Sequence, residues 1–498
     1  MSAENWMPIF VLMSSFMTGL LIFSLDEGRH ALRTVLNMLG ATIKLVLVGV
    51  MLWGVFHERA YEMRFPVVPG VEMILRADAL AMIFLTLSAV LWLVTTAYAV
   101  GYLEGAPNRR RFFGFFSLCV TSTMGISLAG NLFTFFIFYE MLTLTTYPLV
   151  VHRGTKKALD AGAAYLRYTL AGGAVLLVGI VWLHALAGPF EFTTGGALGH
   201  LGTEHASSLV IIFAILMAGL GVKAAIVPLH GWLPTAMVAP APVSALLHAV
   251  AVVKAGVFGI VRVVYNVYGI ESASALGVTA PLAAVAAVTI VYASVRALSQ
   301  DDLKRRLAFS TVSQLSYIIL GIALAGPIST VGGLAHLAHQ GIMKITLFFS
   351  AGIIAETIGL HRISEMNGVG RRLPVTSAAF TIAALGMIGV PPTAGFISKW
   401  YLGTGALASG QPWVLAVLAV STLLNAAYFL PVINALWFGE RSASWPEEKG
   451  RGRLWETDPW LLVPMCVTAA MTVLAGLLAG EFLSPLEWAK LIAWREYK

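Results

Sequence analysis

The chain has 498 residues, of which 58% are hydrophobic and only 11% are charged. A soluble globular protein carries about 25% charged residues, so this composition, with a mean hydropathy of +0.82, excludes a chain built from soluble domains. The net charge is +7, and a basic excess of this kind raises nucleic acid or acidic lipid as a partner.

Apolar runs of about 20 residues recur along the chain, and a helix of that length crosses the core of a bilayer. No Lys or Arg precedes the first run, which therefore predicts a first span and not a signal peptide. The sequence predicts an all-α polytopic membrane protein with about fourteen transmembrane helices at residues 6–24, 31–56, 78–101, 112–129, 131–151, 160–187, 207–229, 240–268, 273–297, 309–325, 330–358, 374–402, 413–438 and 460–482.

The basic residues are distributed unevenly between the odd-numbered and the even-numbered loops. Nineteen lie in odd-numbered loops or their flanks: Arg29, Arg33, Arg109, Arg110, Arg111, Arg153, Lys156, Lys157, Arg296, Lys304, Arg305, Arg306, Arg362, Arg371, Arg372, Arg441, Lys449, Arg451 and Arg453. Five lie in even-numbered loops or the C-terminal tail: Arg59, Arg64, Lys490, Arg495 and Lys498. The positive-inside rule then predicts a multi-pass membrane protein with both termini outside and the odd-numbered loops in the cytoplasm, and nucleic acid is not needed to explain the charge.

Eight basic residues remain within or at the ends of spans, where a charge needs an aqueous cavity or a partner. We expect Lys44, Arg76 and Arg262 to reach an interface with their long side chains, while Arg167 is assigned no role. The other four lie mid-span and are all lysines, which can release a proton when buried, whereas arginine cannot. They are predicted proton carriers: Lys223, Lys254, Lys344 and Lys399.

Glu140 is the only carboxylate deep within a predicted span, so it is expected to have a basic partner. Asp78, at the start of its span, is expected to cap the helix. His336 and His339 are three residues apart and share a helix face that leads toward Lys344.

His248 lies six residues before Lys254. Because histidine titrates near neutral pH, these side chains favour a proton relay over simple packing. No carboxylate or thiolate accompanies the histidines at metal-ligand spacing, and the two cysteines lie inside apolar runs, so no metal and no cofactor is expected.

Two predicted spans contain prolines close to a lysine. Pro228 and Pro234 follow Lys223, and a Pro391–Pro392 pair precedes Lys399. Proline frees a backbone carbonyl, which membrane helices tolerate where they line a cavity. Broken helices at corresponding places favour two inverted five-helix repeats with broken helices 7 and 12. The predicted domains are 1–111 (spans 1–3), 112–268 (spans 4–8), 273–438 (spans 9–13) and 439–498 (the last loop and span 14).

Five segments together resemble the antiporter-like subunits of respiratory complex I and of Mrp-type cation/proton antiporters. They are FYEMLTLTTYPLV (138–150), the stretch from KAAIVPLHGWLP to GVFGIVR (223–262), DDLKRRLAFSTVSQLSY (301–317), HLAHQGIMKITLFFSAG (336–352) and GVPPTAGFISKW (389–400). The resemblance covers residues 70–440 and is most like the D subunit of Mrp antiporters or its membrane-bound hydrogenase equivalent.

The resemblance implies a charged central axis in a fourteen-helix bundle. The motif match assigns its residues to spans five, seven, eight, eleven and twelve: Glu140, Lys223, Lys254 with His248, His339 with Lys344, and Lys399. The implied function is proton translocation within a multi-subunit Na+/H+ antiporter, and a proton-pumping subunit of a redox complex is the alternative. Whether the subunit belongs to an enzyme stays open. The implied partners are other membrane subunits, the lipid bilayer and protons, and the exchanged cation is left open.

Overall fold

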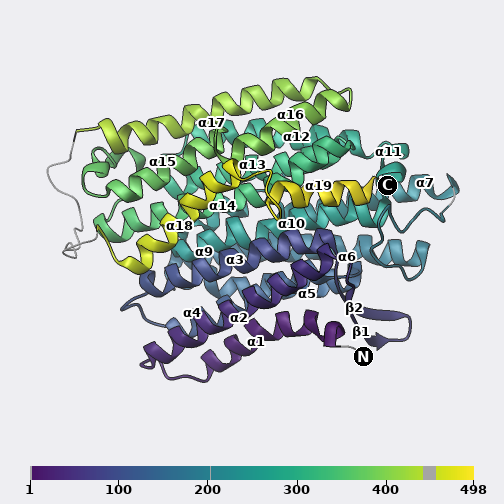
Figure 1. Cartoon of the computed structure of the whole chain (residues 1–498), viewed down its shortest axis with the longest axis horizontal. Coiled ribbons are helices and arrows are strands. Elements are labelled where there is room, and N and C mark those ends of the chain that lie inside the picture. Colours follow the sequence, from purple (N-terminus) through teal and green to yellow (C-terminus); the bar gives the residue numbers. More distant parts are fainter. Residues whose placement is uncertain (1–2, 202, 441–455, 498) are drawn as a thin grey trace.

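The computed structural model describes residues 3–201, 203–440 and 456–497. It is a bundle of near-parallel helices with one small β-hairpin (Figure 1). The helices before the chain midpoint are α1 Met7–Phe23, α2 His30–Phe56, α3 Ala79–Tyr102, α4 Arg109–Leu128, α5 Leu132–Val150, α6 Lys156–Ala187, α7 Ala206–Lys223, α8 Trp232–Thr235 and α9 Ala241–Ala245. The remainder are α10 Val252–Arg262, α11 Ile270–Ala275, α12 Thr279–Leu298, α13 Leu303–Ala323, α14 Pro327–Ile358, α15 Pro374–Ile388, α16 Ala394–Ala408, α17 Trp413–Phe438, α18 Pro459–Leu477 and α19 Pro485–Glu496.

Thirteen helices in the described part of the chain are long and apolar enough to cross a membrane. The predicted twelfth span is missing from that number because it is divided into α15 and α16, so the count of fourteen holds once this broken span is included. The eighth span forms one run from Ala241 to Tyr268 that passes through two π-helical turns, Leu246–Val250 and Val263–Tyr268. The all-α polytopic fold is therefore confirmed, while the division into two repeats stays a prediction.

Two elements were not predicted. Strands β1 Tyr61–Val68 and β2 Val71–Ala77 form an antiparallel hairpin whose turn contains Gly70 at a φ of +82°. The short helix α19 follows the last span. A hairpin of seven or eight residues per strand between two long apolar runs gives a weak sequence signal, because only its first residues alternate in burial.

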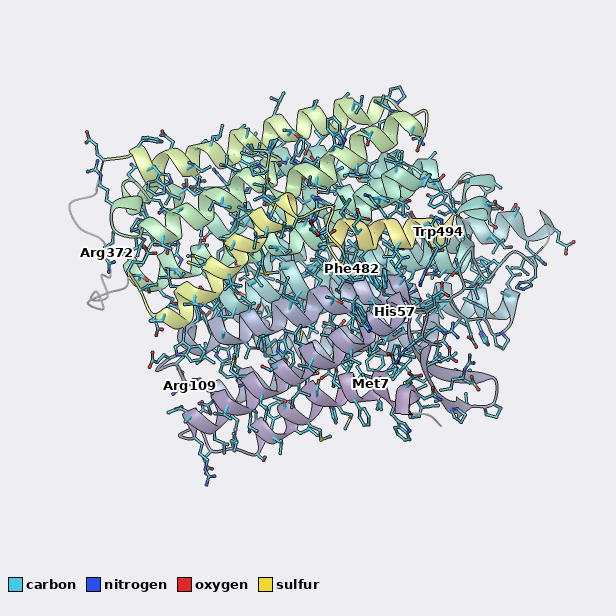
Figure 2. The ribbon with its side chains drawn as sticks, viewed as in Figure 1. Met7, His57, Arg109, Arg372, Phe482 and Trp494 are labelled. Atoms are coloured by element: carbon cyan, nitrogen blue, oxygen red, sulfur yellow. The ribbon has the colours of Figure 1, made fainter. Side chains whose placement is uncertain are left out.

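The basic loops gather at one end of the bundle, which we call the basic end. Arg109 and Arg372 lie there, and Trp494 lies toward the opposite end (Figure 2). Hydrogen bonds join these loops to one another, as between the Arg111 guanidinium and the His152 carbonyl. Four of the nineteen residues counted for this end, Arg441, Lys449, Arg451 and Arg453, lie outside the described residues, as does Lys498 in the tail.

The opposite end carries the hairpin, and we call it the hairpin end. Figure 1 places both chain termini nearer to it, as the loop parity predicts. Here Arg64 of β1 makes a two-point ion pair with Glu191 in the loop after α6, at 2.6 and 3.0 Å. Arg76 of β2 binds the same carboxylate. The hairpin is thereby fastened to the loop between the sixth and seventh spans.

Candidate functional site

Glu140 and Lys223 meet inside the bundle. Helix α5 begins at an Asn131 cap, whose side chain accepts a hydrogen bond from the Thr134 amide at 2.8 Å. This sets Glu140 in the middle of α5, and Lys223 is the last residue of α7. The Lys223 Nζ lies 4.0 Å from Glu140 Oε1, with the lysine side chain fully buried and the glutamate 22% exposed. The predicted partner of the deep carboxylate is therefore in place.

The break after α7 determines where the Lys223 ammonium lies. Its Nζ donates a hydrogen bond to the Tyr139 carbonyl and sits 3.3 Å from the centroid of the Tyr139 ring, a cation–π contact. The freed carbonyl of Val222 accepts a hydrogen bond from the Trp232 indole at 2.7 Å. The irregular backbone is thus satisfied by the short helix α8, and Lys223 is left to face α5.

Small residues bring the helices around this pair together. A Cβ on Gly173 of α6 would come within 2.3 Å of Glu140 Oε1, and one on Gly256 within 2.2 Å of the Ala224 backbone nitrogen. The carboxylate oxygen Oε1 has no hydrogen-bond partner among the described residues. Glycine on α6 therefore provides the space that the Glu140 carboxylate occupies.

His248 lies within the first π turn of the eighth span, and Lys254 follows it in the first turn of α10. The Lys254 Nζ donates to the Leu337 carbonyl of α14 at 2.5 Å. His248 is fully buried, its ring lies 4.6 Å from that of Phe348, and neither ring nitrogen has a partner among the described residues. The two residues that the motif match assigns to this span are therefore not joined by a hydrogen bond within the described residues.

The two histidines of α14 have different surroundings. His336 bonds Ser398 of α16 through Nδ1 at 2.8 Å and Gln314 of α13 through Nε2 at 3.0 Å. His339 is fully buried, and both of its ring nitrogens lack partners in the described part of the chain. His336 therefore ties three helices together, whereas His339 keeps both nitrogens free.

Lys344, also on α14, bonds the side chain of Ser310 on α13 and the Leu307 carbonyl, the latter at 3.2 Å. Its Nζ lies 5.9 Å from the Phe429 ring centroid. No carboxylate of the described residues forms an ion pair with it. A fully buried lysine held only by neutral groups can exchange its proton without breaking an ion pair.

Lys399 occupies the break of the twelfth span. Helix α15 ends at Ile388, where Gly389 adopts a φ of +98°, a region that favours glycine. The carbonyls of Met387 and Ile388 are then free, and the Lys399 Nζ donates to them at 3.0 and 2.7 Å. The sequence predicts freed carbonyls around this lysine, and the structure has them.

Of the predicted site residues, Glu140 and Lys223 form an ion pair, and the others lie at separate positions in the bundle. No hydrogen bond in the described part of the chain joins Lys254 to His248 or Lys344 to His339. Between them lie further buried polar atoms without protein partners, including the whole amide of Gln340 and the Tyr317 hydroxyl. Buried polar groups of this kind are usually satisfied by water.

Three of the expected interface residues are corrected by the structure. Lys44 is fully buried, bonded to Ser15 and 4.5 Å from the Trp92 ring centroid. Arg262 is equally buried and binds Asp78 through two hydrogen bonds of 2.7 and 2.9 Å. Asp78 also caps α3 as predicted, by accepting from the Ala81 amide. Lys44 and Arg262 thus bind partners inside the protein, and their long side chains do not extend to the membrane surface.

Arg76, the third of these residues, lies on β2 and not in a span. Its guanidinium binds Glu62 and Glu191 and donates to the Phe192 carbonyl at 3.0 Å. The ion pairs place it in the hairpin cluster instead of at a helix end. The missed hairpin accounts for this error.

The sequence places Lys304 in a loop, yet this residue contacts the eighth span. Its Nζ donates to the Ala239 carbonyl at 2.6 Å and lies 3.4 Å from the Ser244 hydroxyl. Its position in the first turn of α13, after an Asp302 cap, gives no signal of this contact. Ser244, which Lys304 contacts, lies four residues before His248, so the two share a helix face. This spacing is the one feature of the sequence that links Lys304 to a predicted site residue.

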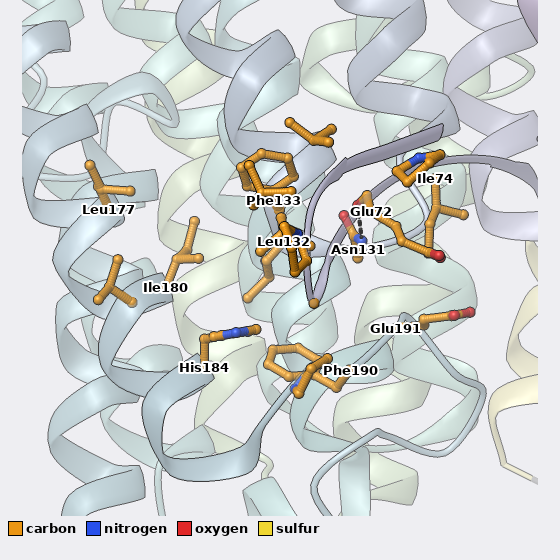
Figure 3. Close-up of a pocket in the computed structure, with 18 residues that line it drawn as sticks. Glu72, Ile74, Asn131, Leu132, Phe133, Leu177, Ile180, His184, Phe190 and Glu191 are labelled. Atoms are coloured by element: carbon orange, nitrogen blue, oxygen red, sulfur yellow. Dashed lines mark hydrogen bonds between the residues drawn. The ribbon is translucent and has the colours of Figure 1, made fainter. Parts of the chain in front are cut away.

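A cavity of 830 Å³ lies under the hairpin between α5 and α6, and Figure 3 shows Leu132, His184 and Phe190 around it. None of the predicted proton carriers lines it, so we place the chemistry in the charged axis and not in this cavity. Within the described ranges, no group of three or more His, Cys, Asp and Glu residues is arranged to hold a metal ion.

Comparison with known proteins identifies the family. The membrane region of the NADH:quinone oxidoreductase/Mrp antiporter family matches residues 129–425. The chain is 36% identical over 439 residues to the N subunit of the NADH-quinone oxidoreductase of Desulforudis audaxviator, over 86% of each chain. It is 26% identical over 420 residues to the D subunit of a Na(+)/H(+) antiporter of Bacillus subtilis, over 83% of this chain and 82% of that one.

The fold is also shared with solved structures. A chain of the Mrp complex from Dietzia sp. superposes with a TM-score of 0.88 at 24% identity, over 100% of this chain and 98% of that chain. At this identity the likeness concerns the fold. From the family match and the relative at 36% identity, the chain belongs to the NADH:quinone oxidoreductase/Mrp antiporter family of membrane proteins.

Proposed function

We propose that the chain is the proton-translocating membrane subunit of a multi-subunit monovalent cation/proton antiporter. The observation that carries the proposal is the Glu140–Lys223 pair, a titratable carboxylate 4.0 Å from a fully buried lysine. The positive charge of Lys223 and the negative charge of Glu140 stabilise each other. Loss of a proton from Lys223 therefore makes the ionised form of Glu140 less stable. A proton can therefore be taken up or released by the pair as a unit.

Beyond this pair, protons would pass to Lys254, Lys344 and Lys399. Each of these ammonium groups is held by carbonyl or hydroxyl oxygens, and none pairs with a carboxylate of the described residues. Water bound to the free nitrogens of His248 and His339 would bridge the gaps between the lysines. His336 serves as a positioning residue, since both of its nitrogens are engaged. The two five-span units, 112–268 and 273–438, would each contribute one half of this path.

Partner subunits are supported by charge on the outer surface of the bundle. Arg167 lies on α6, eleven residues from the helix start, and is exposed. An arginine exposed to hydrocarbon at that depth is costly. We therefore propose that a neighbouring membrane subunit covers this face of α6 and brings a carboxylate or water to Arg167. Replacing Arg167 with Glu should then reduce recovery of the assembled complex.

The orientation follows from the basic end, which we place in the cytoplasm of a bacterial or archaeal cell membrane. Glu104 is exposed in the loop between α3 and α4 at that end. A Glu104→Cys variant should react with a membrane-impermeant thiol reagent in inverted vesicles and not in intact cells. Labelling of intact cells would reverse the orientation.

A second candidate function is proton pumping within a redox complex, and the 36% identity to a NADH-quinone oxidoreductase subunit favours it. The proton path would be the same, while the energy would come from electron transfer in other subunits. Proton flux in vesicles that contain the whole complex separates the two functions. Flux that needs a monovalent cation gradient supports the antiporter, and flux that needs a reductant supports the redox complex.

The cation path is proposed to lie in another subunit. A sodium site needs several oxygen ligands, and Glu140 is the only deep carboxylate predicted for the spans. Vesicles tested with sodium, potassium and neither ion would show which cation is exchanged by the complex.

A further inference from the structure

Lys44 has no part in the charged axis, yet it is a fully buried lysine in the middle of α2. It bonds the hydroxyl of Ser15 on α1 and lies against the ring of Trp92 on α3. No carboxylate in the described part of the chain forms an ion pair with it. Both contacts are available to an ammonium group, and the hydroxyl also serves a neutral amine, so the site suits either protonation state.

A row of polar residues leads from Lys44 to the basic end. His30, Arg33, Asn37 and Lys44 are separated by three, four and seven residues, so they share one face of α2. Arg33 is 2% exposed and Asn37 is fully buried, although both lie on a helix in an otherwise apolar span. Arg33 and Lys44 are eleven residues apart, or about 16 Å along the helix. The polar row thus reaches from the surface to the middle of the span.

Neighbouring helices contribute a second polar row opposite the first. The Ser15 hydroxyl lies 2.8 Å from that of Thr121 on α4, and Thr121 bonds the Ser117 carbonyl at 3.0 Å, one turn closer to the basic end. The Ser117 hydroxyl and the Asn37 Oδ1 atom are buried without a protein partner among the described residues. We call these two rows, with Lys44 at their inner end, the polar seam.

The seam ends at Lys44. Continuing along the same face of α2 toward the hairpin end, the next inward-facing residues are Val48, Met51 and Val55, which are apolar and at most 3% exposed. Water held by the seam would therefore communicate with the basic end alone. At the mouth of the seam, His30 bonds the guanidinium groups of Arg33 and Arg109, and the Glu27 carboxylate accepts from the Arg110 amide at 3.2 Å. Two further titratable groups of the enclosing helices, Tyr98 on α3 and Cys119 on α4, bond the Phe349 carbonyl and the Thr146 hydroxyl.

We propose that Lys44 is a separate proton-binding site, outside the axis from Glu140 to Lys399, that exchanges its proton with the basic end through the polar seam. The site is a well with one opening, because the apolar stretch beyond Lys44 blocks passage to the hairpin end. It places a protonatable group in the first three spans, which the proposed function leaves without a role.

Access to the seam can be tested with the whole complex in vesicles of both orientations. In a background where Cys119 and Cys466 are replaced by serine, Asn37→Cys should react with a small, membrane-impermeant thiol reagent only when the basic end is exposed. Val48→Cys, on the same helix face beyond Lys44, is the matched control and should stay unlabelled from both sides. An unlabelled Asn37→Cys in a correctly assembled complex, or a labelled Val48→Cys, would overturn the seam.

Protonation of Lys44 itself can be followed by reductive methylation, which modifies only the neutral amine, with mass spectrometry of the peptide. Modification of Lys44 should rise with the pH applied at the basic end, and Lys156, which is exposed at the start of α6 at the same end, serves as the reference. A Lys44 that stays unmodified at every pH at which Lys156 reacts would refute the proposal. Neither experiment depends on transport, so the antiporter assignment can fail while this inference stands, and the reverse also holds.

Discussion

Lys223 and Lys399 both lie beside a helix break, but the two breaks use the lysine differently. At the first, Lys223 ends α7 and faces the Glu140 carboxylate at 4.0 Å. At the second, Lys399 follows the break and is held by the carbonyls of Met387 and Ile388, with no carboxylate of the described residues paired to it. Lys223 has a carboxylate partner, whereas Lys399 is held by backbone carbonyls, with the Thr422 hydroxyl at 3.5 Å and the Tyr317 ring centroid at 5.4 Å.

This difference predicts how each lysine gives up its proton. The Lys223 charge depends on the protonation state of Glu140, so the two titrate together. The carbonyls around Lys399 cannot take up a proton, so that lysine titrates on its own. The Lys223 site is suited to couple its protonation to the movement of a charge nearby. The Lys399 site is suited to exchange protons with water at the end of the path.

The largest effect is expected from Glu140→Ala. Removing one partner of a buried ion pair leaves the other charge uncompensated, at a cost of about 3–5 kcal/mol. Lys223 would then lack the carboxylate with which it titrates, and proton flux in vesicles containing the complex should be abolished. Glu487→Ala removes a half-exposed carboxylate of α19 that pairs with Lys490, away from the charged axis, and is the control, with flux expected to stay normal. Near-normal flux for Glu140→Ala at normal expression would contradict the coupled site.

Lys399→Arg tests the second site. Arginine keeps the positive charge and can bond the same carbonyls, but it does not release its proton. The variant should assemble normally and transport protons at a small fraction of the wild-type rate. Lys399→Glu can carry a proton and should restore part of that loss. The opposite order, with arginine tolerated and glutamate inactive, would mean that Lys399 only joins α15 to α16.

Much of this comparison was predictable from the sequence. Apolar run length indicates the spans, and Pro391 beside Lys399 predicts the freed carbonyls. One deep carboxylate predicts a basic partner for Glu140, and the family resemblance implies that this partner is Lys223. Buried charge in a membrane span is rarely accidental and narrows the candidates for the proposed axis. Charge alone does not name them, since Lys44 and Arg262 are equally buried and lie outside the axis.

The wrong predictions concern contacts between residues that are far apart in the sequence. The spacing of apolar residues along one helix does not reveal such contacts. The sequence predicts Lys44 at an interface, because nothing in its own helix reveals Ser15 and Trp92 on other helices. Arg262 finds Asp78, which is 184 residues away in the sequence. The motif match assigns His248 with Lys254 to one span and His339 with Lys344 to another, and within the described residues neither pair is joined by a hydrogen bond.

A smaller effect is expected from Gly173→Ala. The new methyl group would lie 2.3 Å from Glu140 Oε1, so the carboxylate must move away from Lys223. Because the displaced atoms end a flexible side chain, thermal stability should change little while proton flux falls severalfold. Gly49→Ala on α2 meets nothing within 4 Å and is the control. Unchanged flux for Gly173→Ala would show that the 4.0 Å separation is not critical.

The smallest effect concerns Glu191, the solvent-accessible counterpart of Glu140. Burial alone raises the pKa of Glu191, but hydrogen bonds from Arg64 and Arg76 outweigh it and hold the pKa below its usual 4.5. A carboxylate with a lowered pKa stabilises the folded state above the unfolded pKa, and this contribution is lost as pH falls through the folded value. The ion pairs therefore fasten the hairpin near neutral pH and weaken in acid.

Amide hydrogen exchange in residues 61–77, corrected for the intrinsic rate at each pH, measures this attachment. Arg64 is 42% exposed, and solvent-screened ion pairs contribute at most about 1 kcal/mol, so protection should fall by no more than about fivefold on acidification. Glu191→Gln cannot ionise, and its protection should be lower at neutral pH and independent of this titration. If the two proteins lose protection in parallel, the hairpin is held by its apolar contacts, and the ion pairs at this end are incidental. Such a result would sharpen the contrast with Glu140, whose partner is fully buried and whose loss is expected to stop transport.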